Sequence, residues 1–157
     1  MSREIKFRGK DSDTGEWRYG YYAQHEKVTL CPVYENKEAF EKAVVENTEH
    51  YIIFDGFSDW NMTRAFYRAD VDGKTVGQYT GMKDCIGKEI YEGDIVEINE
   101  EEDYYGERIG DVCFIDVGGC WYINGVEDGV ADIDRNYHLD VIGNRWDNPE
   151  LRVGRGT

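Results

Sequence analysis

Short runs of alternating or apolar residues recur along the whole chain, and most have the length of β-strands. Residues 4–8 alternate so that Ile5 and Phe7 share one face, which predicts a half-buried first strand. A turn of Asp, Ser, Thr and Gly follows, and the aromatic run 17–22 predicts the second strand of a hairpin. Residues 51–54 are apolar and predict a buried strand.

One segment has helical spacing. Asn36 is a suitable N-cap, and Phe40, Ala43 and Val44 would share one face of a helix from residue 37 to about residue 46. A helix of about three turns is marginal alone, so we expect it to dock on the sheet.

Two further segments of the N-terminal half carry weaker patterns. Residues 28–33 are β-prone, but Pro32 favours an edge strand or a strand end. Residues 57–68 show no period and are predicted to be irregular. Because no glycine-serine or proline-rich linker divides the chain, we expect two lobes, residues 1–72 and 73–157, in one compact unit.

The segment 76–96 organises the second half of the chain. It predicts two short strands around glycine-bearing turns, and Gly93-Asp94 then opens a third strand at 95–98. The adjacent Ile95 and Val96 indicate that this third strand contacts protein on both faces. Residues 138–143 predict the last strand.

Gly118-Gly119 predicts a two-residue type I′ hairpin between 112–117 and 120–123. In that register Val117 lies opposite Cys120 and Phe114 opposite Ile123. Both faces of the hairpin are largely apolar, so Cys113 and Cys120 are predicted to be core thiols too far apart for a disulfide.

The central stretch also carries a family resemblance. The strings VGQYTG at 76–81 and GKEIYEGDIV at 87–96 resemble the signature of the YopX family of phage and prophage proteins, and REIKFR at 3–8 and VIGN at 141–144 resemble its start and end. The resemblance implies a mainly β fold, an SH3-like small β-barrel preceded by a β-rich N-terminal part with one short helix. It implies no activity, because none is established for the family. Cys85-Ile86 replaces the polar turn residues usual there, so we expect this pair to be exposed.

Charge is concentrated in one region. The net charge is −15, and fifteen Asp and Glu against one Arg between residues 89 and 134 give −14 of it. Phosphate backbones are bound through Lys and Arg, so direct nucleic-acid binding is disfavoured. A dense negative field instead steers basic partners toward the protein.

Residue spacing gives no reason to expect a metal, a cofactor or a membrane segment. Cys31, Cys85, Cys113 and Cys120 contain no CxxC pair, and His25, His50 and His138 lie far apart. No run approaches the ~18 apolar residues of a membrane span, and no signal peptide is recognisable, so we predict a cytoplasmic protein with reduced thiols. The sequence does not decide whether Cys85 is reactive.

These patterns favour a non-enzymatic phage-type accessory protein that binds a host or phage protein of basic character and self-associates. One version is mimicry of a nucleic acid. The candidate binding surface, chosen in or beside the central motif, comprises Tyr79, Tyr91, Glu92, Asp94 and Trp121. Each could instead be scaffold, and the Asp94 carboxylate could simply bond backbone N–H groups of its turn.

Two other classes stay open at this point. A hydrolase could use Glu89, Glu92 and Asp94, or a cysteine with His138 or His25, although no catalytic residue is assigned. A small barrel could also bind nucleic acid, and the aromatic run 17–22 could stack on bases instead of packing in a sheet.

Overall fold

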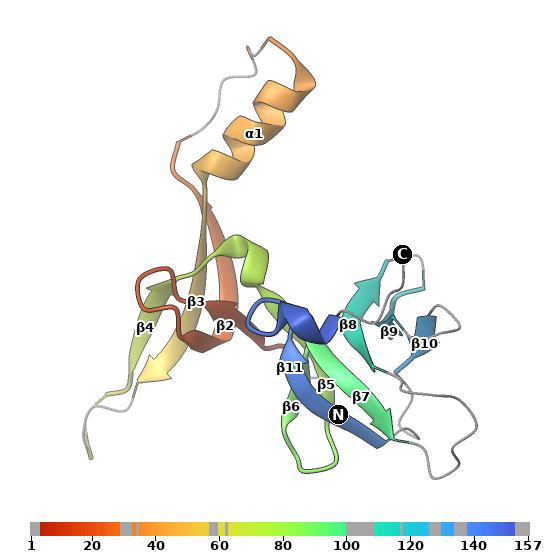
Figure 1. Ribbon diagram of the computed structural model, residues 1–157. Helices are drawn as coiled ribbons and strands as arrows, with labels where there is room; N and C mark the ends of the chain where they lie inside the picture. The colour runs from red at the N-terminus through yellow and green to blue at the C-terminus, as the bar shows by residue number, and fades with distance from the viewer. Residues whose placement is uncertain are drawn as a thin grey trace. The chain divides into compact units, whose positions relative to one another are not determined.

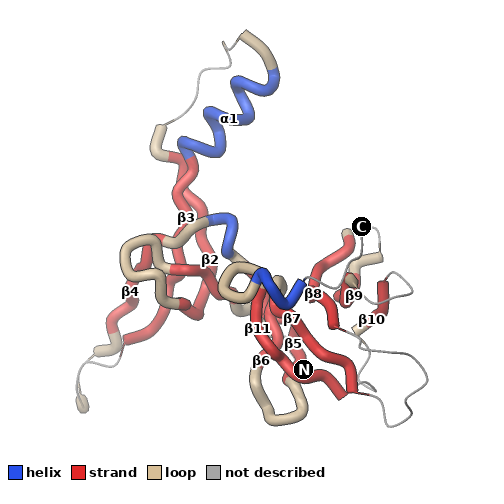
Figure 2. Tube along the Cα trace, viewed as in Figure 1, coloured by secondary structure: helices blue, strands red, loops and turns tan. Residues whose placement is uncertain are grey.

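The computed structural model is mainly β, as predicted (Figures 1 and 2). It describes residues 4–28, 33, 35–56, 60–61, 63–99, 109–116, 118–125, 130–133 and 138–152. The chain divides into two compact units, an N-terminal unit, Lys6–Val76, and a C-terminal unit, Gly77–Thr157 together with Met1–Ile5.

The N-terminal unit contains an antiparallel sheet in the order β4-β3-β2-β1. Its strands are β1 (Phe7–Lys10), β2 (Trp17–Glu26), β3 (Thr48–Gly56) and β4 (Ala65–Asp70). The predicted β1–β2 hairpin is confirmed, although β1 begins at Phe7 and leaves Ile5 exposed. The prediction that residues 57–68 are irregular was wrong for β4. Because β4 is an exposed edge strand, it shows no buried alternation in the sequence.

The inner face of this sheet carries its core. Ile52, Ala69 and Val71 are buried there, and Phe7 and Tyr22 pack against them. Asp11, which follows β1, forms a bridge with Val71, which follows β4. A short 3-10 turn, η1 (Gly73–Thr75), follows this bridge.

The aromatic run of β2 is divided between the two faces. Tyr22 points inward, where its ring lies 5.5 Å from Phe7 and its hydroxyl lies 2.6 Å from His50 Nδ1. Tyr19 and Tyr21 occupy the alternate, outward positions and are exposed. The prediction that this run packs in the sheet therefore holds for Tyr22 but not for Tyr19 and Tyr21.

Helix α1 (Lys37–Asn47) forms where predicted, and Asn36 Oδ1 accepts a hydrogen bond from Ala39 N. Its docking on the sheet was predicted wrongly. Figure 1 shows α1 standing beyond the ends of β2 and β3, and Phe40 is exposed. The helix is held at its base, where the buried Asn47 side chain bonds both N and O of Val28.

The C-terminal unit contains a hairpin and a five-stranded antiparallel sheet. The hairpin is formed by β5 (Gly77–Lys83) and β6 (Glu89–Tyr91), which confirms the two predicted central strands. The sheet has the order β10-β9-β8-β7-β11 and is followed by the 3-10 turn η2 (Pro149–Arg152). Its strands are β7 (Asp94–Asn99), β8 (Ile109–Ile115), β9 (Cys120–Asn124), β10 (Val130–Asp132) and β11 (His138–Asn144).

One face of the five-stranded sheet forms the core of this unit, with Val96, Ile98, Val112, Ile123 and Leu139 buried together with Ile90 of the hairpin. Ile95 is also fully buried, as expected for a strand that contacts protein on both faces. Within the part of the chain that is described, β10 and β11 remain the edges of the sheet and no closed barrel forms.

The β8–β9 hairpin differs from its predicted register. Ile115 lies opposite Cys120 and Phe114 opposite Trp121, so the turn is two residues longer than a type I′ turn. Only Gly119 of the glycine pair has a positive φ, 63°, whereas type I′ needs two such residues. Instead, Gly118 N and Gly119 N both donate to Ile115 O. Cys120 is exposed and Cys113 half-buried, so the prediction of core thiols was wrong for Cys120.

The turn between β6 and β7 joins four parts of the C-terminal unit. Asp94 Oδ2 accepts from Tyr91 N at 2.8 Å, which confirms the backbone-bonding role considered for this carboxylate. Gly93 has φ +80°, and a Cβ there would overlap the Trp146 ring.

The neighbouring backbone groups of the same turn reach other elements. Glu92 N donates to Gln78 O of β5, and Gly93 N donates to Val112 O of β8. Arg145 N donates to Gly93 O, and Arg145 Nη2 also donates to Val112 O. The turn is therefore the junction of β5, β7, β8 and the segment after β11.

A second carboxylate-centred turn closes the β1–β2 hairpin. Asp11 Oδ1 accepts from Asp13 N and Thr14 N, and Arg18 Nε donates to Asp11 Oδ2 at 2.9 Å. The Thr14 N–H, the Arg18 side chain and the Asp13 N–H, in that order, lower the Asp11 pKa below its ordinary value of 3.8.

Because the folded-state pKa of Asp11 is depressed, its ionised form stabilises the fold at neutral pH, and that contribution is lost as the pH falls below 3.8. We predict that Asp11→Asn lowers the urea midpoint at pH 7 but not at the acid end of the titration. Urea unfolding across this pH range checks it, with Asp13→Asn as the control for a charge removed at the same turn. If the urea midpoint of Asp11→Asn were lower than that of the wild type by the same amount at every pH, the stabilising role of the ionised Asp11 would be contradicted.

For the β6–β7 turn we predict that Asp94→Ala lowers the free energy of unfolding by about 1–3 kcal/mol, because it leaves the Tyr91 N–H without this buried acceptor. The exposed Asp116→Ala should change it by less than about 0.5 kcal/mol. Denaturant unfolding measures both. Equal losses of unfolding free energy in the two variants would show that the hydrogen bond of Asp94 does not stabilise the turn.

Candidate interaction surface

Three of the five residues predicted to form a binding surface are buried. Tyr79 is 5% exposed, Tyr91 2% and Asp94 1%, and the two tyrosine rings lie 5.4 Å apart. Their aromatic area is used inside the C-terminal unit, so these side chains cannot contact a partner in the folded protein.

The other two predicted residues, Glu92 and Trp121, are half-buried. Glu92 belongs to the β6–β7 turn, whereas Trp121 packs against the core and lies edge-on to Phe114, with ring centroids 5.0 Å apart. Glu89, proposed as a hydrolase carboxylate, accepts a hydrogen bond from the Tyr91 hydroxyl at 2.6 Å. The Glu89 and Asp94 carboxylates of the central motif are therefore engaged in holding the hairpin and its turn.

An acidic pair that the sequence did not single out lies on the face of the five-stranded sheet opposite the core. Glu97 of β7 is directly opposite Asp140 of β11, and both side chains are partly exposed. Directly opposed like charges destabilise a sheet unless another group compensates them. We call Glu97 and Asp140 the acidic pair.

Neutral donors hold one member of the acidic pair in place. Asn99 Nδ2 donates to Asp140 Oδ2 at 2.7 Å, and the Cys85 thiol donates to Asp140 Oδ1. Neither donor carries a positive charge, so neither is a compensating cation. Among the described residues, neither Glu97 nor Asp140 forms an ion pair. Carboxylates of the N-terminal unit, in contrast, pair with cations, as Asp11 does with Arg18 and Asp55 with Arg64.

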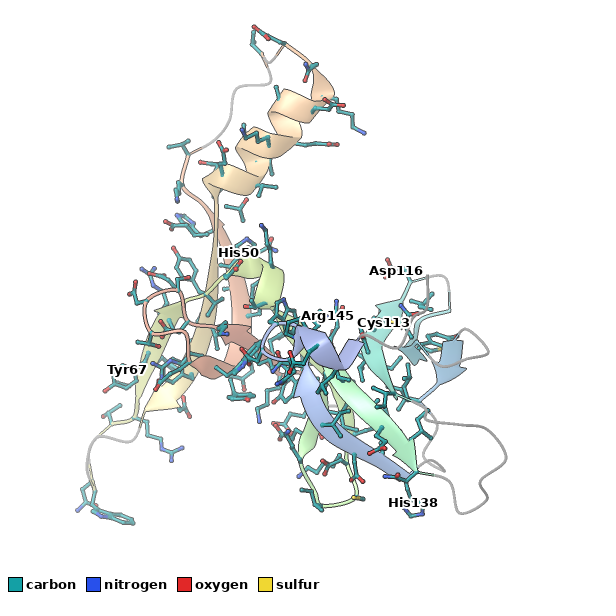
Figure 3. All side chains as sticks on the ribbon, in the orientation of Figure 1. His50, Tyr67, Cys113, Asp116, His138 and Arg145 are labelled. Atoms are coloured by element: carbon teal, nitrogen blue, oxygen red, sulfur yellow. The ribbon has the colours of Figure 1, made fainter. Side chains whose placement is uncertain are left out.

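Cys85 lies in a setting that favours its protonated form. The Cys85-Ile86 pair is exposed, as expected. The hydrogen bond to Asp140, followed by desolvation, raises the pKa of the Cys85 thiol, which favours the protonated form. Burial likewise raises the pKa of Cys113. Figure 3 shows Cys113 and His138 well apart within the C-terminal unit, so these two do not form a thiol–imidazole pair.

Within the described ranges, no group of three or more His, Cys, Asp or Glu side chains is arranged to hold a metal ion. In the same part of the chain, no helix has the length and apolar character needed to cross a membrane.

Sequence reasoning missed the acidic pair because its members are 43 residues apart (140 − 97). The available signal was the outward position of Glu97 between the buried Val96 and Ile98. The pairing of β7 with β11 then brings Asp140 beside it, and a local pattern does not encode that pairing.

Comparison with solved structures finds a similar chain described as "Crystal structure of protein EF1440 from Enterococcus faecalis". It is 20% identical to this chain, with a TM-score of 0.46, and the alignment covers 96% of this chain and 99% of the other. No curated protein matches the sequence.

The family comparison covers more than the central motif. The family model described as "YopX protein" matches residues 6–151, which includes both units. The resemblance noted in the strings at 76–81 and 87–96 is thereby confirmed, and the chain belongs to the YopX family.

Proposed function

We propose that this protein is a non-enzymatic accessory protein of phage type that binds a basic protein partner through the acidic face of its C-terminal unit. The observation that carries this proposal is the acidic pair, two carboxylates directly opposed across β7 and β11 without a compensating cation among the described residues. A Lys or Arg side chain of a partner placed between them would relieve their repulsion and gain two charge-assisted hydrogen bonds.

The distribution of charge supports the same surface. The C-terminal unit contains 8 Lys and Arg against 20 Asp and Glu, a net charge of −12, whereas the N-terminal unit contains 10 against 13, a net charge of −3. Such a field accelerates encounter with a basic surface and makes binding sensitive to salt. Occupation of a basic groove that normally holds nucleic acid is one form of this activity.

Other parts of the proposal follow from the sequence and from the family resemblance. A partner from host or phage, self-association and a cytoplasmic location remain proposals, as does an SH3-like barrel in the C-terminal unit. The carboxylate or thiol hydrolase is the weaker alternative, because Asp94 and Glu89 bond neighbouring groups and the Cys85 pKa is raised.

Binding of single-stranded nucleic acid is the second candidate, and one observation favours it. Tyr19 and Tyr21 are exposed at alternate positions of β2, and exposed aromatic side chains can stack on bases. Stacking platforms work beside a positive groove, and the N-terminal unit has a net charge of −3. We therefore rank this candidate below protein binding.

We predict that the tagged protein, incubated with nuclease-treated bacterial lysate at low salt, retains a basic protein that is released at high salt. The double variant Glu97→Gln/Asp140→Asn should retain at least tenfold less of that protein. The control Glu26→Gln/Glu38→Gln removes two exposed charges from the N-terminal unit and should retain it. Mass spectrometry of the eluates measures all three.

Equal capture by both double variants would contradict the role of the acidic pair, and an empty eluate from the folded wild type would remove the proposal. Fluorescence anisotropy with a labelled oligothymidine at low salt distinguishes the second candidate. Binding that is lost in Tyr19→Ala/Tyr21→Ala but kept in Glu97→Gln/Asp140→Asn would favour nucleic acid.

A further inference from the structure

Strand β4 is an exposed edge of the N-terminal sheet. Its hydrogen-bonded neighbour is β3. Among the described residues, its other side is paired at one end, where Asp70 and the two residues after it contact residues 10–12. Phe66 is 73% exposed and Tyr67 45%, and Arg68 is exposed as well. A long, partly apolar edge of this kind is a template for pairing with another strand unless it is protected.

Two hydrogen bonds near the end of β4 show which backbone groups face outward. Val71 N donates to His50 O, so the groups of Val71 point toward β3. Asp70 O, one residue earlier, points the other way and accepts from Ser12 N. Because these directions alternate along an antiparallel strand, the N–H and C=O groups of Phe66 and Arg68 face the open edge.

The side chains of β4 select one register for pairing with a second copy. When a twofold axis perpendicular to the sheet relates the two strands, residues on the same face lie opposite each other. The axis must then pass midway between the two copies of one residue of β4. An axis at Arg68 opposes two arginines, and an axis at Phe66 opposes Arg68 to Arg64 of the second copy. Both of these registers are disfavoured by directly opposed like charges.

An axis at Tyr67 gives complementary neighbours. Phe66 lies opposite Arg68 of the second copy, which brings a guanidinium beside an aromatic ring. The position opposite Asp70 is already taken by Ser12, so Arg64 adds no contact of its own. The same register opposes the outward-facing groups of Phe66 and Arg68, so each such pair can exchange two N–H···O bonds. Among the axes at Phe66, Tyr67 and Arg68, the axis at Tyr67 therefore combines outward-facing backbone groups with an aromatic–cation contact and opposes no like charges.

We propose that β4 pairs antiparallel with β4 of a second copy of this chain, with Tyr67 on the twofold axis. The main-chain pairing runs over residues 65–69 and stops there, because Ser12 N already occupies Asp70 O. So short a contact predicts a weak dimer that forms in a concentration-dependent manner. The pairing does not depend on the acidic pair or on any other partner.

Sedimentation equilibrium of the wild-type protein from about 10 μM to about 1 mM tests the association, a range that brackets weak dimers. We expect a monomer–dimer equilibrium. Phe66→Ala and Arg68→Ala should each weaken it at least fivefold, because each removes one half of the same ring–guanidinium contact. The double variant should therefore be no weaker than the single variants. A wild-type monomer at all concentrations, or a double variant weaker than both single variants, would overturn the proposal.

Cysteine cross-linking tests the register to one residue, in a background with the four natural cysteines replaced by serine. Tyr67→Cys places two thiols opposite each other at a non-hydrogen-bonded pair, where Cα atoms are about 4.5 Å apart and a disulfide can form. It should give a covalent dimer under mild oxidation with copper phenanthroline. The matched control Phe66→Cys lies one residue away on the same exposed strand and should give at least tenfold less.

Equal cross-linking of the two cysteine variants, or more with Phe66→Cys, would overturn the register. Circular dichroism confirms that each variant is folded. Repeating the reaction with Glu97→Gln/Asp140→Asn added should leave the yield unchanged, because the acidic pair has no part in this contact.

Discussion

The turn at Glu92-Gly93-Asp94 is the constraint on which the C-terminal unit depends. A buried carboxylate must find a hydrogen-bond donor, and Asp94 obtains one from the backbone of Tyr91 across the turn. The Gly93 backbone needs a positive φ and no Cβ, because Trp146 lies against it. The Glu92 and Gly93 N–H groups then fix the positions of β5 and β8. One local turn thereby determines how the hairpin, the sheet and the segment after β11 meet.

The most recognisable part of the sequence is therefore largely scaffold. Tyr79, Tyr91 and Asp94 are buried because the central motif builds the core and the turn. The side chains that a partner could reach lie on strands whose positions the turn sets. The acidic pair, for example, forms because β7 begins at Asp94 in register with β11. The N-terminal unit offers a different kind of surface, with exposed aromatic and cationic side chains on the edge strand β4. The two proposed contacts differ accordingly, one governed by charge and the other by backbone pairing.

Local patterns in the sequence predicted the elements that such patterns control. Asn36 marked the start of α1, and Gly93-Asp94 marked the turn, because capping and positive φ are local requirements. The edge strand β4 was not predicted, because the adjacent aromatic residues Phe66 and Tyr67 are both exposed and do not alternate between apolar and polar. The position of α1 escaped as well, because it is set by the bonds of Asn47 to Val28 and not by an apolar face. The acidic pair depends on a long-range strand pairing that no local period reveals.

Hydrogen exchange of the backbone amides of Tyr91, Glu92 and Gly93 tests the central role of the turn most directly. The account predicts that all three exchange only when the whole C-terminal unit unfolds, with the same free energy of opening as the amides of buried Val96 and Val112, because the turn cannot open while β5 and β8 stay in place. Exchange of these three amides at rates near those of an unstructured peptide, while β7 and β8 remain protected, would contradict it.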